Sequence, residues 1–161
     1  MKQIFSFVLL TLFALPVLAQ DSFFEYGTAA EGFEAAKEDD KVVVLYYFDS
    51  ESEGSVDYNH IWSDPLVTRF VDKLAVPVSI ASGTEAEEAL QNLKRKRRRK
   101  ADPYTPGIYF FSSTGRTLGV LRGDLDGQEG IGQFMLMLGA ADYARLENKH
   151  DNGRRRFMRY H

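Results

Sequence analysis

The chain has 161 residues, of which 44% are hydrophobic and 27% charged, with a formal net charge of −3. This composition is typical of one soluble domain, and the length allows a single sizeable core. The sequence contains no cysteine. It therefore excludes disulfide exchange, thiolate nucleophiles, and zinc or iron–sulfur sites that cysteine would ligate.

The first nineteen residues have the three parts of a secretory signal peptide. Lys2 gives a positive start, residues 4–15 form an apolar stretch, and Ala19 is a small residue before a cleavage site. The alternative is an uncleaved membrane anchor, but the stretch is short for a span of about 20 residues, and Pro16 breaks it. We predict a signal peptide over 1–19, a domain over 20–147 and a basic, disordered tail over 148–161, in a periplasmic or secreted protein with no transmembrane segment after cleavage.

The start of the domain predicts a helix followed by a buried strand. Residues 30–38 have the spacing of a short amphipathic helix. The apolar run 41–48 lacks alternation, which predicts a central strand covered on both faces. An acidic turn over 49–54 and a helix over 55–62 follow.

The next segment predicts a capped helix and a second strand. Asp64 can cap a helix in which Pro65 takes an early position. The residues expected to be buried on this helix are Leu66, Val67, Phe70 and Val71. A strand is expected over 76–80, and Pro77 argues against a place for it in the middle of the sheet.

The second half predicts a helix, a hairpin and a last helix. Thr84 and Glu87 form a capping box for a helix that buries Ala86, Ala89, Leu90 and Leu93. Strands over 108–112 and 116–122 flank a turn and predict an antiparallel hairpin. A helix over 128–146 follows, with Ile131, Phe134, Met135, Leu138 and Ala141 facing inward. This order predicts an α/β fold with a mixed central sheet and helices on both faces.

Charge is divided unevenly along the chain. Residues 20–93 carry 16 acidic and 4 basic side chains, whereas residues 94–161 carry 7 acidic and 15 basic ones. A run of seven cations lies at the end of the helix that Thr84 caps, namely Lys94, Arg95, Lys96, Arg97, Arg98, Arg99 and Lys100. The run is either a solvated helix end or a patch for an anionic component of the cell envelope. Behind a signal peptide, we do not expect a nucleic-acid partner.

Four features resemble the thioredoxin superfamily, in its secreted thioredoxin-like branches. They are the buried strand 42–48 running into a turn, the Trp-Ser-Asp-Pro-Leu-Val stretch 62–67, the Thr-Pro-Gly step 105–107, and the hairpin with its Ser-Thr-Gly-Arg turn 113–116. The resemblance implies a three-layer sandwich. It also implies that a Cys-x-x-Cys motif would lie near residues 51–54, where this chain has Glu-Ser-Glu-Gly.

The resemblance therefore implies a scaffold that has lost its redox chemistry but keeps a surface for protein or extended peptide. In the family, the backbone beside a cis-proline pairs with the partner by strand addition, and Thr105 and Pro106 would be that edge here. The acidic turn would select basic partners. The candidate binding residues are Asp49, Glu51, Ser52, Glu53, Tyr58, Tyr104, Thr105 and Pro106. For Tyr58 and Tyr104, lining a groove and lying at a rim are equal alternatives.

Other chemistry at the acidic turn has weaker support. Residues 49–54 have the start of a calcium loop, but position 12 would be His60 where a glutamate is required. A hydrolytic triad of His60 with nearby serine and aspartate lacks the usual nucleophile turn. We expect His60 to be a half-buried, hydrogen-bonded helix residue, and we expect no metal, no cofactor and no catalytic residue. A non-thiol enzyme acting through residues 49–53, and an envelope-binding protein acting through residues 94–100, remain the alternatives.

Overall fold

The computed structural model describes residues 23–49, 58–97 and 104–157, and the side chains of 93–97 and 151–157 lie outside that description. The predicted signal peptide, residues 50–54 of the acidic turn, the first three residues of the helix predicted over 55–62 and the end of the basic run are thus not covered. The elements are α1 (Ala29–Glu38), β1 (Val42–Phe48), α2 (Asn59–Trp62), α3 (Pro65–Leu74), β2 (Ala75–Ala81), α4 (Glu85–Arg97), β3 (Gly107–Phe111), β4 (Thr117–Leu121) and α5 (Gly127–Phe157).

The four described strands form one mixed sheet in the order β2-β1-β3-β4. β1 pairs in parallel with β2 and antiparallel with β3, and β3 and β4 form an antiparallel hairpin. The predicted mixed sheet, central first strand and hairpin are all confirmed. Their order along the chain is that of a thioredoxin-like domain.

β2 lies beside only one long strand, as its proline predicted. Pro77 pairs with Val44 of β1. On the other side of β2, the Ser79 amide donates to the Tyr26 carbonyl at 3.3 Å, within an isolated parallel bridge. Residues two apart in a strand point their amides the same way, so the donor that Pro77 lacks belongs to this outer side.

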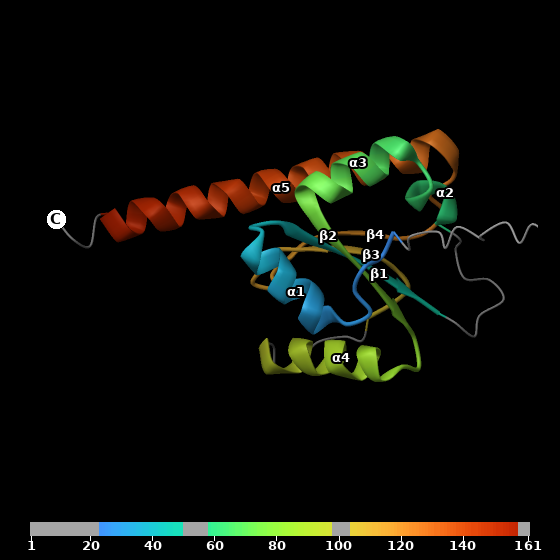
Figure 1. The fold of residues 1–161 in the computed structure, drawn as a ribbon, viewed down its shortest axis with the longest axis horizontal. Coiled ribbons are helices and arrows are strands. Elements are labelled where there is room, and N and C mark those ends of the chain that lie inside the picture. Colours follow the sequence, from blue (N-terminus) through green and yellow to red (C-terminus); the bar gives the residue numbers. More distant parts are fainter. Residues whose placement is uncertain (1–22, 50–57, 98–103, 158–161) are drawn as a thin grey trace, which may run out of the picture.

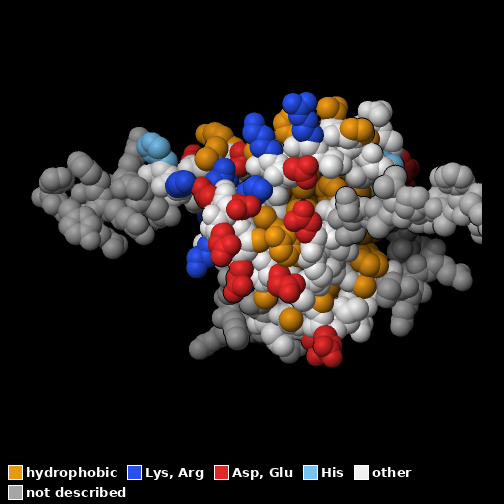
Figure 2. All heavy atoms as spheres, in the orientation of Figure 1, with side chains coloured by type: hydrophobic (Ala, Val, Ile, Leu, Met, Phe, Trp, Pro, Cys, Tyr) orange, Lys and Arg blue, Asp and Glu red, His pale blue; other side chains and the backbone are white. Residues whose placement is uncertain are grey.

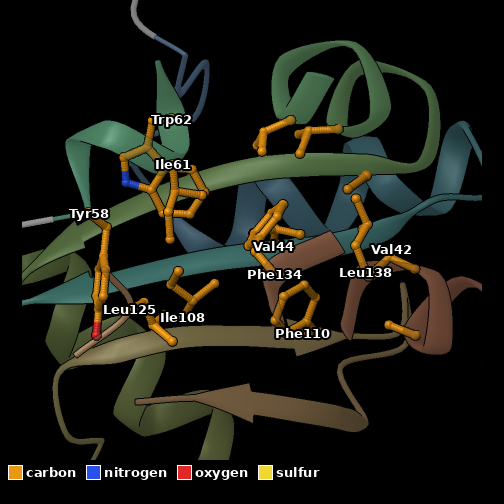
Figure 3. Packing of buried hydrophobic residues seen from close by; sticks show 14 residues of the cluster. Val42, Val44, Tyr58, Ile61, Trp62, Ile108, Phe110, Leu125, Phe134 and Leu138 are labelled. Carbon is orange, nitrogen blue, oxygen red and sulfur yellow. The ribbon is translucent and has the colours of Figure 1, made fainter. Parts of the chain in front are cut away.

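Helices cover both faces of the sheet and give three layers (Figure 1). One face of β1 packs with α2, α3 and α5, in a core that includes Val44, Phe110 and Phe134 (Figure 3). The other face packs with α1 and α4, in a second core that includes Leu45 and Leu90. The apolar run of β1 therefore lacks alternation because both of its faces are buried.

Two helix starts have the caps that the sequence predicted. The Asp64 carboxylate accepts from the amides of Leu66 and Val67 at 2.8 and 3.2 Å, and Pro65 opens α3. At α4, the Thr84 hydroxyl accepts from the Glu87 amide at 3.3 Å, while the Glu87 carboxylate accepts from the Gly83 amide at 2.8 Å. Both α3 and α4 are thus stabilised at their first turn.

Three expectations about these helices need correction. Leu66 and Phe70 of α3 are 59% and 42% exposed, because α3 shares its face of the sheet with α5 and buries only the stripe of Val67 and Val71. Ala89 of α4 is exposed as well, whereas Leu90 is buried and Ala86 packs partly against the same core. The side chain of Leu93 lies outside the description.

The last helix is longer than predicted. α5 continues to Phe157, so residues 148–157, expected to be a disordered tail, are helical. Arg145 and Lys149 on α5 reach the Asp40 carboxylate at 3.0 and 2.6 Å. These ion pairs join α5 to the domain at Asp40. The end of the helix projects beyond the sheet (Figure 1).

Candidate binding site

The residues expected to receive a partner strand lie at one end of the sheet. Tyr47 of β1 pairs with Gly107 of β3. Asp49 and Thr105 each lie two residues beyond that last pair, so the structure brings them to the same end. Thr105 and Pro106 are exposed. The peptide bond between them is trans, as are all the described peptide bonds, whereas the resemblance implied a cis bond.

The Tyr109 hydroxyl occupies both polar groups of the Thr105 backbone. It donates to the Thr105 carbonyl at 2.6 Å and accepts from the Thr105 amide at 3.0 Å. The Arg122 guanidinium donates to the same oxygen at 3.2 Å and lies 5.6 Å from the centre of the ring. One hydroxyl has one proton and two lone pairs, so these three bonds fill its capacity.

A glycine allows β4 to lie close beside this turn. A Cβ added at Gly107 would lie 2.6 Å from the Leu121 carbonyl oxygen of β4. The hairpin therefore fits only with glycine here, and the fit brings Arg122, the residue after β4, within reach of Tyr109. Gly107, the last residue of the Thr-Pro-Gly step, is thus required by packing in this chain.

Tyr104 covers a group of rings on the α1–α4 side of the sheet. Its ring centre lies 5.0 Å from that of Tyr109 and 6.2 Å from that of Tyr47. Tyr104 is half-buried. The structure thus places it against other aromatic rings, and its outer part borders the exposed Thr105.

The Tyr47 hydroxyl ties this ring group to the start of α4. It donates to the Glu87 carboxylate at 2.7 Å. Burial and this bond raise the pKa of Tyr47, and the same bond holds the pKa of Glu87 below its usual range. Tyr47 therefore stays a neutral donor and Glu87 a charged acceptor, an arrangement that supports structure.

Tyr58 and His60 connect α2 to the loop between β4 and α5. Tyr58 is 2% exposed, its hydroxyl donates to the Gly123 carbonyl at 2.9 Å, and burial raises its pKa. The ring of His60 bonds through Nε2 to the Leu125 carbonyl at 2.6 Å, so the expected half-buried, bonded histidine is found. Tyr58 therefore neither lines a groove nor lies at a rim. It is a core residue, and its ring packs edge-on against Tyr46.

The described part of the acidic turn is its first residue. The Asp49 carboxylate accepts from the Ser82 hydroxyl at 2.8 Å, which ties the end of β1 to the end of β2. The candidates Glu51, Ser52 and Glu53 lie outside the described residues, as do the side chains of all seven cations in the basic run. Among the described side chains, no group of three histidines or carboxylates could hold a metal ion.

The sequence missed Tyr109 and Arg122 as parts of this end of the sheet. Tyr109 stands in an aromatic run and is 3% exposed, and nothing in that run indicates where its hydroxyl points. Arg122 follows a strand with no distinguishing signal. The pairing of the two depends on the hairpin, whose closure brings residue 122 back over residue 109.

Several solved structures are similar to this chain at low sequence identity. A thioredoxin from Thermus thermophilus is 21% identical over 71% of this chain and 84% of its own, with a TM-score of 0.49. The DsbH oxidoreductase is 16% identical over 72% of this chain and 85% of its own, with a TM-score of 0.45. The C-terminal domain of Neisseria meningitidis DsbD, in its oxidised form, is 21% identical over 66% of this chain and 90% of its own, with a TM-score of 0.43. No protein-family model and no curated protein matches the chain.

These likenesses carry nothing about function at such identities and scores. The fold class follows from the sheet order and the three layers of the structure, which are those of a thioredoxin-like α/β domain. With no cysteine in the chain, thiol–disulfide exchange is closed to it. In the parts of the chain that the structure describes, no helix is both long and apolar enough to cross a membrane.

Proposed function

We propose that this chain is a secreted or periplasmic, redox-inactive protein that binds extended segments of other proteins, in a chaperone-like or scaffold role. The observation that supports the proposal best is the bonding of Thr105. Its amide and carbonyl, at an exposed end of the sheet, meet a single hydroxyl that donates and accepts as a neighbouring strand would.

An incoming strand can replace the Tyr109 hydroxyl bond for bond at Thr105. The exchange has a cost, because each intramolecular hydrogen bond is worth about 1 kcal/mol net. Two such bonds correspond to roughly 2 kcal/mol, or more than tenfold in affinity. Tyr109 thus acts as a cap that weak or poorly matched segments fail to displace.

The surroundings favour a basic, extended partner. Asp49 lies at the same end of the sheet as Thr105, and the sequence adds Glu51 and Glu53 directly after it. Charges at this edge would steer a basic segment toward the uncapped Thr105, and their effect would fall with added salt. The basic run 94–100 would then serve a separate, anionic contact at the envelope.

The test uses extended peptides selected on the wild-type protein from a displayed library. Their affinities are compared between wild type, Tyr109→Phe and the control Tyr143→Phe, which changes a tyrosine that is 67% exposed on α5. Because phenylalanine cannot cap Thr105, we expect Tyr109→Phe to bind about tenfold more tightly, with no change for the control.

Two results would contradict the proposal. One is equal affinity of wild type and Tyr109→Phe, since an edge that pairs with peptide must first lose its cap. The other is unchanged binding after Pro106→Ala combined with Glu51→Lys and Glu53→Lys. A photo-crosslinking residue at position 104, with a second at position 98 as comparison, shows which surface the peptide contacts.

A further inference from the structure

The outer face of α5 carries three large apolar side chains that the domain leaves uncovered. Leu136, Tyr143 and Leu146 are 77%, 67% and 48% exposed. At 100° per residue, their spacing of seven and three places them on one stripe of the helix. The residues that α5 buries against the sheet, among them Phe134 and Leu138, lie on the opposite face. α5 is therefore apolar on two faces, and the sheet accounts for one of them.

The length of this stripe suits a helical partner. Counted as a heptad seam, Leu136 and Tyr143 take one position, and Gly139 and Leu146 take the other. A Cβ added at Gly139 or at Gly132, one heptad earlier, would meet nothing within 4 Å. These glycines serve no packing within the monomer, and beside the three large side chains they leave room for another helix to approach.

Charge along the same helix is divided unevenly. Within α5, residues 127–144 carry two carboxylates and no cation, whereas residues 145–157 carry five cations and two carboxylates. A parallel pair of α5 helices would bring like charges together along its whole length. An antiparallel pair would set the acidic first half of each helix against the basic end of the other, and it would also oppose the two helix dipoles.

The shape of the molecule allows this arrangement. The last turns of α5 run past the sheet and past α1, and none of the other described elements lies beside them (Figure 1). Apolar side chains reach the surface over α3 and α5, between lysines and arginines (Figure 2). In an antiparallel pair, the projecting end of one copy would lie along the first half of α5 of the other, so both ends gain a neighbour.

We propose that two copies of this chain associate through the outer faces of α5, antiparallel and centred near Tyr143. In this register Leu136 of one copy faces His150 of the other. Tyr143 meets its own counterpart. The two basic ends then project in opposite directions along a single axis, and Thr105 stays exposed on each copy. The interface is independent of peptide binding at Thr105.

The expected affinity is modest. In a standard interface each partner buries roughly 800 Å², and three large side chains per copy bury only part of such an area. We therefore expect a dissociation constant in the micromolar range. The test is sedimentation equilibrium of the protein recovered from expression of the full-length chain, over concentrations that extend to high micromolar. Tyr143→Glu places two buried carboxylates face to face and should weaken association at least tenfold. The control Ala30→Glu adds the same charge at an exposed position of α1, on the other side of the sheet, and should leave association unchanged.

Orientation is tested with single cysteines, which the natural chain lacks. Leu136→Cys should crosslink with His150→Cys when the two variants are mixed, and neither should crosslink efficiently with itself. Self-crosslinking of Leu136→Cys would overturn the antiparallel arrangement. A monomer at every concentration, or equal loss of association in Ala30→Glu, would overturn the interface itself. All these positions are exposed, and far-UV circular dichroism checks that each variant keeps its helices.

Discussion

Replacing Phe134 by alanine should remove a large share of the stability of this domain. Phe134 is fully buried, with its ring 5.4 Å from that of Trp62 and 5.6 Å from that of Phe110, measured between centres. It joins α5 to α2 and to β3. Truncating a buried phenylalanine costs about 3–5 kcal/mol, from lost burial and from the cavity that remains. Alanine favours helix by about 0.5 kcal/mol, so the loss cannot come from helix propensity.

The measurement is denaturant unfolding of dilute protein, where self-association contributes little. A domain of this size has a free energy of unfolding of about 5–15 kcal/mol, so roughly a fifth or more of it should be lost, and the denaturant midpoint should fall accordingly. Leu136→Ala is the matched control, two residues along the same helix but 77% exposed, and should stay within about 0.5 kcal/mol of wild type. If the two variants lose the same amount, the assignment of the two faces of α5 is wrong.

Two further predictions concern helix ends. Asp64→Ala removes the acceptor of the Leu66 and Val67 amides at the start of α3 and should lower the free energy of unfolding in urea by about 1 kcal/mol. Asp64→Asn should keep most of the stability that this cap contributes. At the other end of the molecule, the hydrogen bond from Lys149, with Arg145 beside it, holds the pKa of Asp40 below its usual range. A carboxyl with a lowered pKa in the folded state adds stability above its unfolded pKa, and this is lost as pH falls through the folded value. In Asp40→Asn the thermal midpoint should therefore fall less steeply below about pH 4 than in wild type. The ion pairs of Asp40 contribute at most about 1 kcal/mol to stability, because Asp40 is half-exposed. If the midpoints of Asp40→Asn and wild type fall equally with pH, Asp40 does not have this role.

Much of the fold could be predicted because its signals are local. The unalternating run of β1 marks a strand covered on both faces, and Asp64 with Pro65 marks a helix start whatever the rest of the chain does. The length of α5 was missed for the opposite reason. The Asp40 carboxylate that pairs with Lys149, beyond the predicted end of the helix, is 109 positions away in sequence, so only the folded chain shows this contact.

The place of Thr105 and Pro106 in the fold could be predicted from the sequence, whereas their hydrogen bonds could not. Thr105 and Pro106 lie at the exposed end of the sheet, as their place before a strand implied. The cap on Thr105 depends on the hydroxyl of Tyr109, and a tyrosine in an aromatic run gives no sign of where its oxygen points. Tyr58 was misplaced because the loop that covers it, at Gly123, comes from a distant part of the chain.

The outer side of β2 has a consequence for how this protein behaves when crowded. An uncovered strand edge can recruit strands from other molecules, and stacks of such strands grow into fibrils. On this edge the donor is missing at Pro77, and the next one, at Ser79, already bonds to Tyr26. An apolar seven-residue strand can therefore stand at the border of the sheet without offering a template for aggregation.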